Sequence, residues 1–148
     1  MTFIDFLKHF DSLVWEALWK IMECLGCPAK LVAVVRSLYS QSTISIRLSM
    51  DGELAPSFVQ KKGTRQGSGL SPCIFTMPVD FAMKVADMAC EVLGMIGSED
   101  EDKRGAYADD GAERTRNEEE ASVSLQQFEA GAGYGGLGLN VGKTEAMG

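Results

Sequence analysis

The segment Ala106-Tyr107-Ala108-Asp109-Asp110-Gly111 carries two adjacent carboxylates directly after a short apolar run. The apolar residues predict a strand that stops at the aspartate pair. Two neighbouring ionised carboxylates repel each other, and few cationic side chains stand close to them in the sequence. A divalent cation with oxygen ligands, Mg²⁺ in particular, is one way to stabilise such a pair. A solvated turn is the other interpretation, because Asp-Asp-Gly is also a common turn composition.

A third carboxylate, Asp5, favours the metal interpretation. It lies in the apolar segment 2–6, which predicts a second short strand leading into a helix. Three carboxylates at the ends of two neighbouring strands can hold two cations about 3.5–4 Å apart, one activating an attacking hydroxyl and the other stabilising a leaving phosphate oxygen. We therefore predict that the carboxyl groups of Asp5, Asp109 and Asp110 converge within about 8 Å, the reach of a two-cation cluster.

Four segments resemble the palm motifs of reverse transcriptases. They are residues 3–12, 65–75, 106–110 and 138–145, which stand in family order and span nearly the whole chain. The third contains the Tyr-Ala-Asp-Asp box, and the Arg-Gln-Gly start of the second is similar to the non-LTR, LINE-type retrotransposon branch. The resemblance implies an α+β palm, an antiparallel sheet backed by helices. Residues 1–148 would then form a partial palm domain, with fingers and thumb largely missing.

Position within the first and third motifs implies roles for individual residues. Asp5, Asp109 and Asp110 would be the catalytic carboxylates, which bind two Mg²⁺ ions. The backbone carbonyl of Phe6 would complete a metal shell. Phe10 would lie beneath the incoming sugar, where a bulky ring excludes a 2′-hydroxyl and so selects deoxynucleotides. Core packing is the plainer role of Phe10, and the two roles can coexist.

The second and fourth motifs imply the substrate contacts. Gln66 and Gly67 would lie in the loop that contacts the nucleotide and the template base, and Gly67 lacks a Cβ that would hinder a close backbone approach. Lys143 would lie near the leaving pyrophosphate, where a cation offsets developing charge. A solvated surface lysine is the alternative for Lys143.

The activity that the resemblance implies is RNA-directed DNA polymerisation. A primer 3′-hydroxyl would attack the α-phosphorus of a deoxynucleoside triphosphate and pyrophosphate would leave, so that catalysis consists of positioning and charge stabilisation. The expected partners are an RNA template, a DNA primer, deoxynucleoside triphosphates, and the missing fingers and thumb segments of a longer polyprotein.

A catalytically inactive reverse-transcriptase remnant, with only a structural or interaction role, is the alternative. Three departures from the family pattern favour it. Segment 111–116 is polar where the family has an apolar strand beside the strand of Asp5, His9 replaces an alanine, and Pro78 lies in a helix expected to be continuous. A nucleotide-binding protein that uses residues 142–144 is a third, weaker hypothesis.

Composition limits the function classes further. The chain has 148 residues, which is the size of one domain, and 45% of them are hydrophobic, which excludes general disorder. The net charge is −7, which excludes a protein whose whole surface binds nucleic acid. The charge is unevenly distributed, since residues 1–75 carry +2 and residues 76–148 carry −9. The sequence shows no secretory leader and no apolar run of the roughly 20 residues that span a membrane, so we expect no membrane partner and an intracellular protein with four reduced cysteines.

Hydrophobic periodicity predicts the remaining elements. A helix capped by Asp11 or Ser12 should bury Val14, Leu18, Ile21, Met22 and Leu25, and a second helix opened by Pro28 should bury Leu31, Val34, Val35 and Leu38. A hairpin should join residues 43–48 and 57–61 around Asp51-Gly52. A long helix should run from Ser71-Pro72 to about Leu93 and be kinked at Pro78. A further helix should begin at Glu118 and bury Leu125 and Phe128, and a short strand should lie within 137–141.

Other patterns are better explained by structure than by chemistry. Cys24 and Cys27 have CxxC spacing but no second pair of metal ligands, which favours packing. The glycines of 131–136 fit G-x-G-x-x-G but are expected to follow a helix rather than a strand, so they do not predict a dinucleotide site. Trp15 and Trp19 could stack on bases, but their spacing favours packing on each other or on the helices.

Overall fold

The computed structural model describes residues 1–7, 9–64, 67–95, 104–107, 110–140 and 142–146. Four short strands form the main sheet, in the order β5 (Arg104–Tyr107), β6 (Asp110–Glu113), β1 (Thr2–Ile4) and β8 (Glu145–Ala146). All neighbours in this sheet are antiparallel. Beyond Ile4 the chain continues into β2 (Phe6–Leu7), which pairs with β7 (Gly138–Leu139) in a separate two-stranded ladder.

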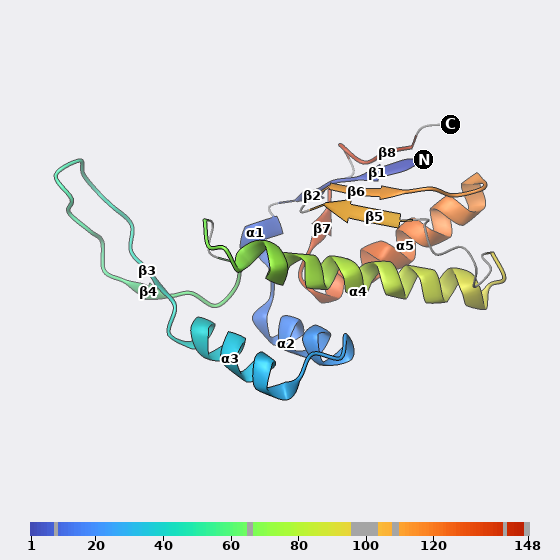
Figure 1. Ribbon diagram of the computed structural model, residues 1–148. Helices are drawn as coiled ribbons and strands as arrows, with labels where there is room; N and C mark the ends of the chain where they lie inside the picture. The colour runs from blue at the N-terminus through green and yellow to red at the C-terminus, as the bar shows by residue number, and fades with distance from the viewer. Residues whose placement is uncertain (8, 65–66, 96–103, 108–109, 141, 147–148) are drawn as a thin grey trace.

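Two long helices, α4 (Ser71–Val92) and α5 (Glu118–Tyr134), lie along one side of the sheet (Figure 1). Their inner faces share a core with the first two strands, in which Ile4 and Phe6 are buried against Phe75 of α4 and Phe128 of α5. The arrangement confirms the predicted α+β class, with antiparallel strands backed by helices. Within the described residues, no helix is both long and apolar enough to cross a bilayer.

The glycine-rich end of α5 forms a close-packed seam with α4. A Cβ on Gly131 would lie 2.9 Å from the Cα of Ala82, and a Cβ on Gly135, just beyond the helix, would lie 3.1 Å from the Cβ of Pro78. Gly131 therefore lets the two helix backbones approach each other, and Gly135 leaves room for Pro78. The G-x-G-x-x-G pattern was expected to follow a helix, but its first two glycines lie inside α5. The long helix α4 continues through Pro78, which is buried in this contact and does not end the helix.

Two further helices, α2 (Trp15–Cys24) and α3 (Ala29–Ser40), form a second core beneath α4 (Figure 1). The predicted cap of α2 is wrong. Asp11 and Ser12 belong to a separate short helix, α1 (His9–Ser12), and Val14 precedes α2 without a side-chain cap. Val14 is also exposed rather than buried, and its backbone N–H donates to the carbonyl of Gly135 at 2.9 Å.

The predicted buried stripe of α3 is also wrong. Val35 is buried as expected, but its buried neighbours are Val32 and Tyr39, and an exposed apolar face remains, made up of Leu31, Val34 and Leu38. Apolar residues occupy both sides of this helix, so its periodicity allowed two choices of inner face. On the face of α3 that is buried, Tyr39 contacts Trp15 and Trp19.

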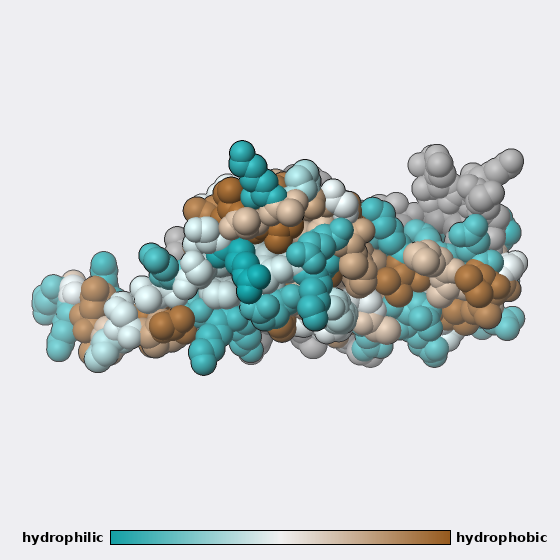
Figure 2. Space-filling view, turned by 90° about the horizontal axis from the view of Figure 1, so that it is seen from below, coloured by the Kyte–Doolittle hydropathy of each residue, from teal (hydrophilic) through white to brown (hydrophobic). Residues whose placement is uncertain are grey.

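The predicted hairpin is confirmed. Strand β3 (Thr43–Ile44) pairs with β4 (Phe58–Val59), and a further bridge joins Arg47 to Leu54 closer to the turn at Gly52. Hydrophobic side chains at this end of the molecule are exposed (Figure 2), and they include Ile46, Leu48, Met50 and Leu54. The hairpin thus extends away from both cores.

The start of α5 also follows the sequence. Asn117 accepts a hydrogen bond from the backbone N–H of Glu120 at 2.8 Å, and three glutamates form the first turn. Phe128 is fully buried and Leu125 packs against the same core. The final predicted strand is shorter than expected, since β7 covers Gly138–Leu139.

We predict opposite effects for the same substitution at two glycines of α5. Gly131→Ala should destabilise the protein by about 1–3 kcal/mol, because the new Cβ meets the backbone of α4. Gly133→Ala should stabilise it by up to about 1 kcal/mol, because a Cβ there has open space and alanine favours a helix. Urea unfolding of both variants measures the difference, and a neutral Gly131→Ala would contradict the seam.

Candidate active site

Asp5 lies where the chain leaves one ladder and enters another. Ile4 before it is the last residue of β1, and Phe6 after it is the first residue of β2. Its own backbone carbonyl accepts a hydrogen bond from the N–H of Asn140 at 2.8 Å. The main chain on both sides of Asp5 is therefore fixed by strand pairing, which limits where its side chain can lie.

The register of the main sheet brings the backbone of Asp110 close to that of Asp5. Ile4 lies opposite Gly111 in the β1–β6 ladder, so that Asp5 and Asp110 are the next residues at the same end of these adjacent strands. The strand predicted to stop at the aspartate pair, β5, does not pair with β1 directly, because β6 lies between them. The residue next to Asp5 is therefore Asp110 at the start of β6. Asp109 and the side chain of Asp110 lie outside the described part of the chain, so the convergence of three carboxyl groups stays a prediction.

The segment after Asp110 corrects an expectation from the sequence. Residues 111–116 are polar, and we expected the family's returning strand to be lost here, but β6 forms and pairs on both sides. Gly111 lies close against Ile4, and Ala112 follows it. Glu113 is buried and accepts a hydrogen bond from the hydroxyl of Ser124 in α5. A hydrogen-bonded carboxylate thus takes the place of an apolar residue in this strand.

The carboxylate of Asp5 has two described partners, and both contact the same oxygen. The side-chain amide of Asn140 donates to Oδ2 at 2.9 Å, and Nζ of Lys143 lies 3.9 Å from Oδ2. Within the described residues, no hydrogen bond or ion pair falls on Oδ1. The side chain of Lys143 is 72% exposed and that of Asp5 is 26% exposed, so the ion pair is a solvated one.

An open hollow of about 460 Å³ adjoins this carboxylate. It is lined by Phe3, Ile4, Asp5, Gly111, Ala112 and Lys143. The structure therefore brings together three of the predicted site positions: the side chains of Asp5 and Lys143, and the backbone of Asp110.

The two predicted phenylalanines both pack on Phe75 of α4. The ring of Phe6 is buried and meets Phe75 edge-on, with centroids 5.8 Å apart. The ring of Phe10 is partly buried, with its centroid 5.5 Å from that of Phe75. The core role expected for Phe10 is thus confirmed, and its position next to an incoming sugar stays a prediction.

The loop of the second motif is anchored to the end of the first. The carbonyl of Phe10 accepts a hydrogen bond from the N–H of Thr64 at 2.6 Å, and the carbonyl of Leu13 accepts one from the N–H of Gly63 at 2.7 Å. Gly63 has φ +83°, and a Cβ on it would lie 2.9 Å from the carbonyl oxygen of Phe10. Only glycine combines this backbone conformation with this close approach.

The nucleotide-contacting pair of this loop is described in part. Gln66 lies outside the described residues. Gly67 has φ +81°, and no atom within the described protein lies within 4 Å of a Cβ built there. The requirement for glycine at this position therefore comes from backbone conformation, and the side on which a Cβ would project is open.

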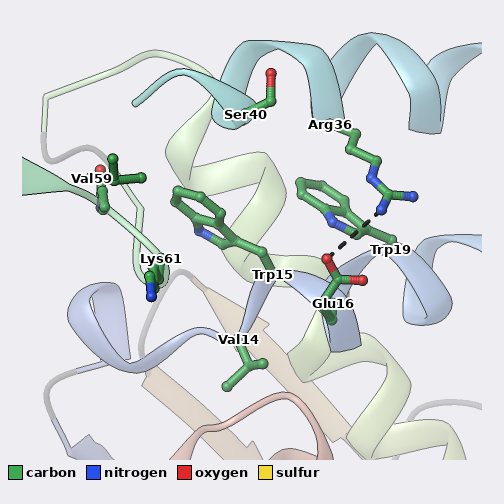
Figure 3. Close-up of a pocket in the computed structure, with 9 residues that line it drawn as sticks. Val14, Trp15, Glu16, Trp19, Arg36, Ser40, Val59 and Lys61 are labelled. Carbon is green, nitrogen blue, oxygen red and sulfur yellow. Dashed lines mark ion pairs between the residues drawn. The ribbon is translucent and has the colours of Figure 1, made fainter. Parts of the chain in front are cut away.

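The two tryptophans of the chain line a separate hollow of about 450 Å³ (Figure 3). Trp15 and Trp19 point from α2 toward α3, and the ion pair between Arg36 and Glu16, 3.8 Å long, lies beside Trp19. The indole N–H of Trp15 donates to the carbonyl of Gly63 at 2.8 Å. Both rings pack edge-on against Tyr39, so the expectation that they pack rather than present stacking faces is confirmed.

The cysteines do not form a described metal site. Cys24 is exposed and Cys27 packs against the second core, so packing explains only the second cysteine of the CxxC pair. Among the residues that the structure describes, no group of three or more His, Cys, Asp or Glu side chains could hold a metal ion.

Sequence reasoning missed Asn140, which makes the shortest described contact with the carboxylate of Asp5. It stands in the fourth motif, three residues before Lys143. An uncharged amide carried no chemical signal of its own in the sequence. Its position between an apolar strand and a Gly-Lys-Thr turn was the available indication.

Comparison with known proteins agrees with this arrangement. The whole chain, residues 1–148, matches the family described as Reverse transcriptase (RNA-dependent DNA polymerase). The chain belongs to the reverse transcriptase family. The resemblance seen in the four motifs is thereby confirmed.

A curated relative supports the retrotransposon origin of this reverse transcriptase domain. The chain is 29% identical, over 107 residues, to the Retrovirus-related Pol polyprotein from type-2 retrotransposable element R2DM of Drosophila melanogaster. The match covers 72% of this chain and 10% of that polyprotein. The chain therefore spans about a tenth of the length of its curated relative.

Reverse transcriptases generally use divalent metal ions, and the chemistry of Asp5 suits such an ion. Carboxylate oxygen is the ligand type that Mg²⁺ prefers. Asp5 offers one carboxylate oxygen without a described protein partner, at the edge of an open hollow and beside the strand that begins with Asp110. This one oxygen is of the type that such an ion binds, and the described residues alone do not complete a set of three ligands.

We predict that the loop anchor at Gly63 is sensitive to a single methyl group. Gly63→Ala should cost about 1–3 kcal/mol more than Gly94→Ala, since both residues have positive φ but a Cβ meets backbone atoms only at Gly63. Urea unfolding followed by tryptophan fluorescence measures both variants, because Trp15 donates to Gly63. Equal costs for the two variants would contradict the anchor.

Proposed function

We propose that this chain carries the polymerase centre of an RNA-directed DNA polymerase from a non-LTR retroelement. The observation that carries the proposal is the register of the main sheet, in which Asp5 and Asp110 lie at the same end of two adjacent strands of a reverse transcriptase domain. The substrates would be an RNA template, a DNA primer and deoxynucleoside triphosphates. Further segments of a longer polyprotein would supply the remaining grip on nucleic acid.

Three carboxylates would hold the metal ions in this proposal. Asp5 would offer Oδ1, and Asp109 and Asp110 would join it from the tip of the β5–β6 hairpin. Two Mg²⁺ ions, when bound, activate the primer hydroxyl and stabilise the leaving phosphate oxygen. The primer 3′-oxygen forms a bond to the α-phosphorus, the bond to the bridging oxygen breaks, and pyrophosphate leaves.

The other predicted residues would position the substrates. Lys143 is exposed at the rim of the hollow beside Asp5, where its charge would offset that of the leaving pyrophosphate. Phe10 is held by Phe75, which would let its ring act as a rigid wall against a 2′-hydroxyl. The loop of Gln66 and Gly67 follows directly from the anchor at Thr64, which would keep it near Phe10.

Two rival hypotheses lose support. The remnant hypothesis depended in part on the loss of the strand after Asp110, and β6 is formed. The nucleotide-binding hypothesis requires free backbone N–H groups at residues 142–144 and a following helix. The N–H groups of Lys143 and Thr144 instead donate to the carbonyl of Asn140, and β8 follows at Glu145.

Primer extension tests the proposal. The purified chain should add deoxynucleotides to a DNA primer on an RNA template in Mg²⁺, and Asp5→Asn or Asp110→Asn should reduce the rate at least about 100-fold, because loss of a group that merely orients a metal ligand already costs 10–100-fold. Radiolabelled incorporation gives the rates.

Asp80→Asn is the matched control. Asp80 is an exposed aspartate of α4, paired with Lys84 at 2.9 Å, and its substitution removes the same charge at a residue that does not line the hollow beside Asp5. It should leave the rate within about twofold, as expected for a surface pair. A chain that binds primer and template yet adds no nucleotide, or an Asp5→Asn variant as active as the parent, would overturn the proposal and favour the inactive remnant.

A further inference from the structure

Asn140 and Asp5 are joined at two points, although 135 positions separate them in the sequence. The backbone N–H of Asn140 donates to the backbone carbonyl of Asp5 at 2.8 Å. The side-chain amide of Asn140 donates to Oδ2 of Asp5 at 2.9 Å. The first contact fixes the distance between the two main chains, and the second fixes the orientation of the carboxylate relative to them.

Asn140 is itself held by the turn that follows it. Its backbone carbonyl accepts hydrogen bonds from the N–H of Lys143 at 3.0 Å, the N–H of Thr144 at 2.9 Å and the hydroxyl of Thr144 at 3.0 Å. Leu139 directly before it is paired with Phe6 in the β2–β7 ladder. The amide donor therefore comes from a fixed support, and its hydrogen bond costs little additional ordering.

We infer that Asn140 is a positioning residue that orients the carboxylate of Asp5 for a divalent cation, an inference that rests on the proposed function. By occupying Oδ2, the amide leaves Oδ1 as the oxygen without a protein partner within the described residues. Groups that hydrogen-bond a metal-binding carboxylate fix its orientation and so support metal affinity. Asn140 does this from a different motif than the one that carries the carboxylate.

The chemistry of an amide suits this role better than a charged group would. A neutral donor satisfies one oxygen while the full negative charge of Asp5 remains available to a cation. A lysine at the same distance would compete with the metal ion for that charge. Lys143 lies farther away, at 3.9 Å, and its side chain is 72% exposed, so it contributes less to the orientation of the carboxylate.

The same residue also sets the position of Lys143. The N–H of Lys143 donates to Asn140, so the backbone position of the lysine follows that of the asparagine. One residue thereby links the acidic group proposed to bind metal and the cation proposed to meet the leaving group. A substitution that removes only the side-chain amide of Asn140 should disturb the orientation of the Asp5 carboxylate and leave the backbone position of Lys143 unchanged.

Binding of Mn²⁺ as a probe for the divalent site tests this inference on the full chain. Asn140→Ala should weaken Mn²⁺ binding about 10–100-fold, the usual cost of losing a group that orients a metal ligand. Titration calorimetry, or the electron paramagnetic resonance signal of free Mn²⁺, gives the affinity. In primer extension, the Mg²⁺ concentration for half-maximal rate should rise by a similar factor while the KM for the primer stays within about twofold.

Two control variants separate orientation from stability. Asn117→Ala removes the other asparagine of the chain, whose side chain caps α5, and should lower the melting temperature without changing Mn²⁺ affinity. Thr144→Val removes a hydrogen bond to the carbonyl of Asn140 but leaves its amide in place, so Mn²⁺ affinity should again be unchanged. Asn140→Ser, which keeps a polar side chain in the turn but cannot reach Asp5, should behave like Asn140→Ala.

The outcomes distinguish this inference from the proposed function. If the parent chain binds Mn²⁺ and Asp5→Asn loses it, but Asn140→Ala and Asn140→Ser bind like the parent, the positioning role is overturned and the proposed function stands. If the parent chain binds no Mn²⁺, both are overturned. Equal losses in Asn140→Ala and Thr144→Val would also overturn the role, because they would show that the turn as a whole is what matters.

Discussion

The junction at Asp5 is the constraint on which the site depends. β1 is paired on both sides within the main sheet, and β2 is paired with β7, so the single residue between them cannot shift without breaking one of the ladders. Four other site positions are located relative to this junction: Asp110 through the β1–β6 register, Asn140 and Lys143 through the turn after β7, and Phe10 through the short helix that follows β2. The pairing of several short strands thus fixes the position of Asp5, which no one of these strands would fix alone.

Sequence alone gave the elements with strong local signals. The hairpin around Gly52 and the start of α5 at Asn117 have turn or capping residues at the required positions, and both are present. The long helix α4 is present as well, but Leu70 precedes it without a side-chain cap, so the predicted cap at Ser71 is wrong. The strands β1 and β5 were also predicted, because apolar runs that stop near a carboxylate are informative at strand ends, whereas β6, which pairs with both, was not. The family itself followed from four motifs in order.

Features decided by packing between distant segments could not be predicted in this way. On the inner face of α3, Tyr39 meets the tryptophans of α2, and the backbone of Val14 bonds to Gly135, which is far from it in the sequence. β6 forms from polar residues because pairing on both sides and the Glu113–Ser124 contact replace hydrophobic burial. Asn140 has no distinctive side-chain chemistry, so its role emerges only when its neighbour in space is known.

Two segments of this domain, the hairpin between β3 and β4 and the stretch from Phe10 to Val14, are bonded to the rest of the fold to different extents. They should therefore tolerate changes in chain length differently. The chain between β3 and β4 reaches away from both cores and is closed by pairing within itself, so insertions and deletions near Gly52 would leave the rest of the fold in register. The stretch from Phe10 to Val14 is bonded to residues 63–64 on one flank and to Gly135 on the other. A length change there would move the first motif against the second, so relatives should differ in length at the hairpin and keep a constant spacing from Asp5 to Val14.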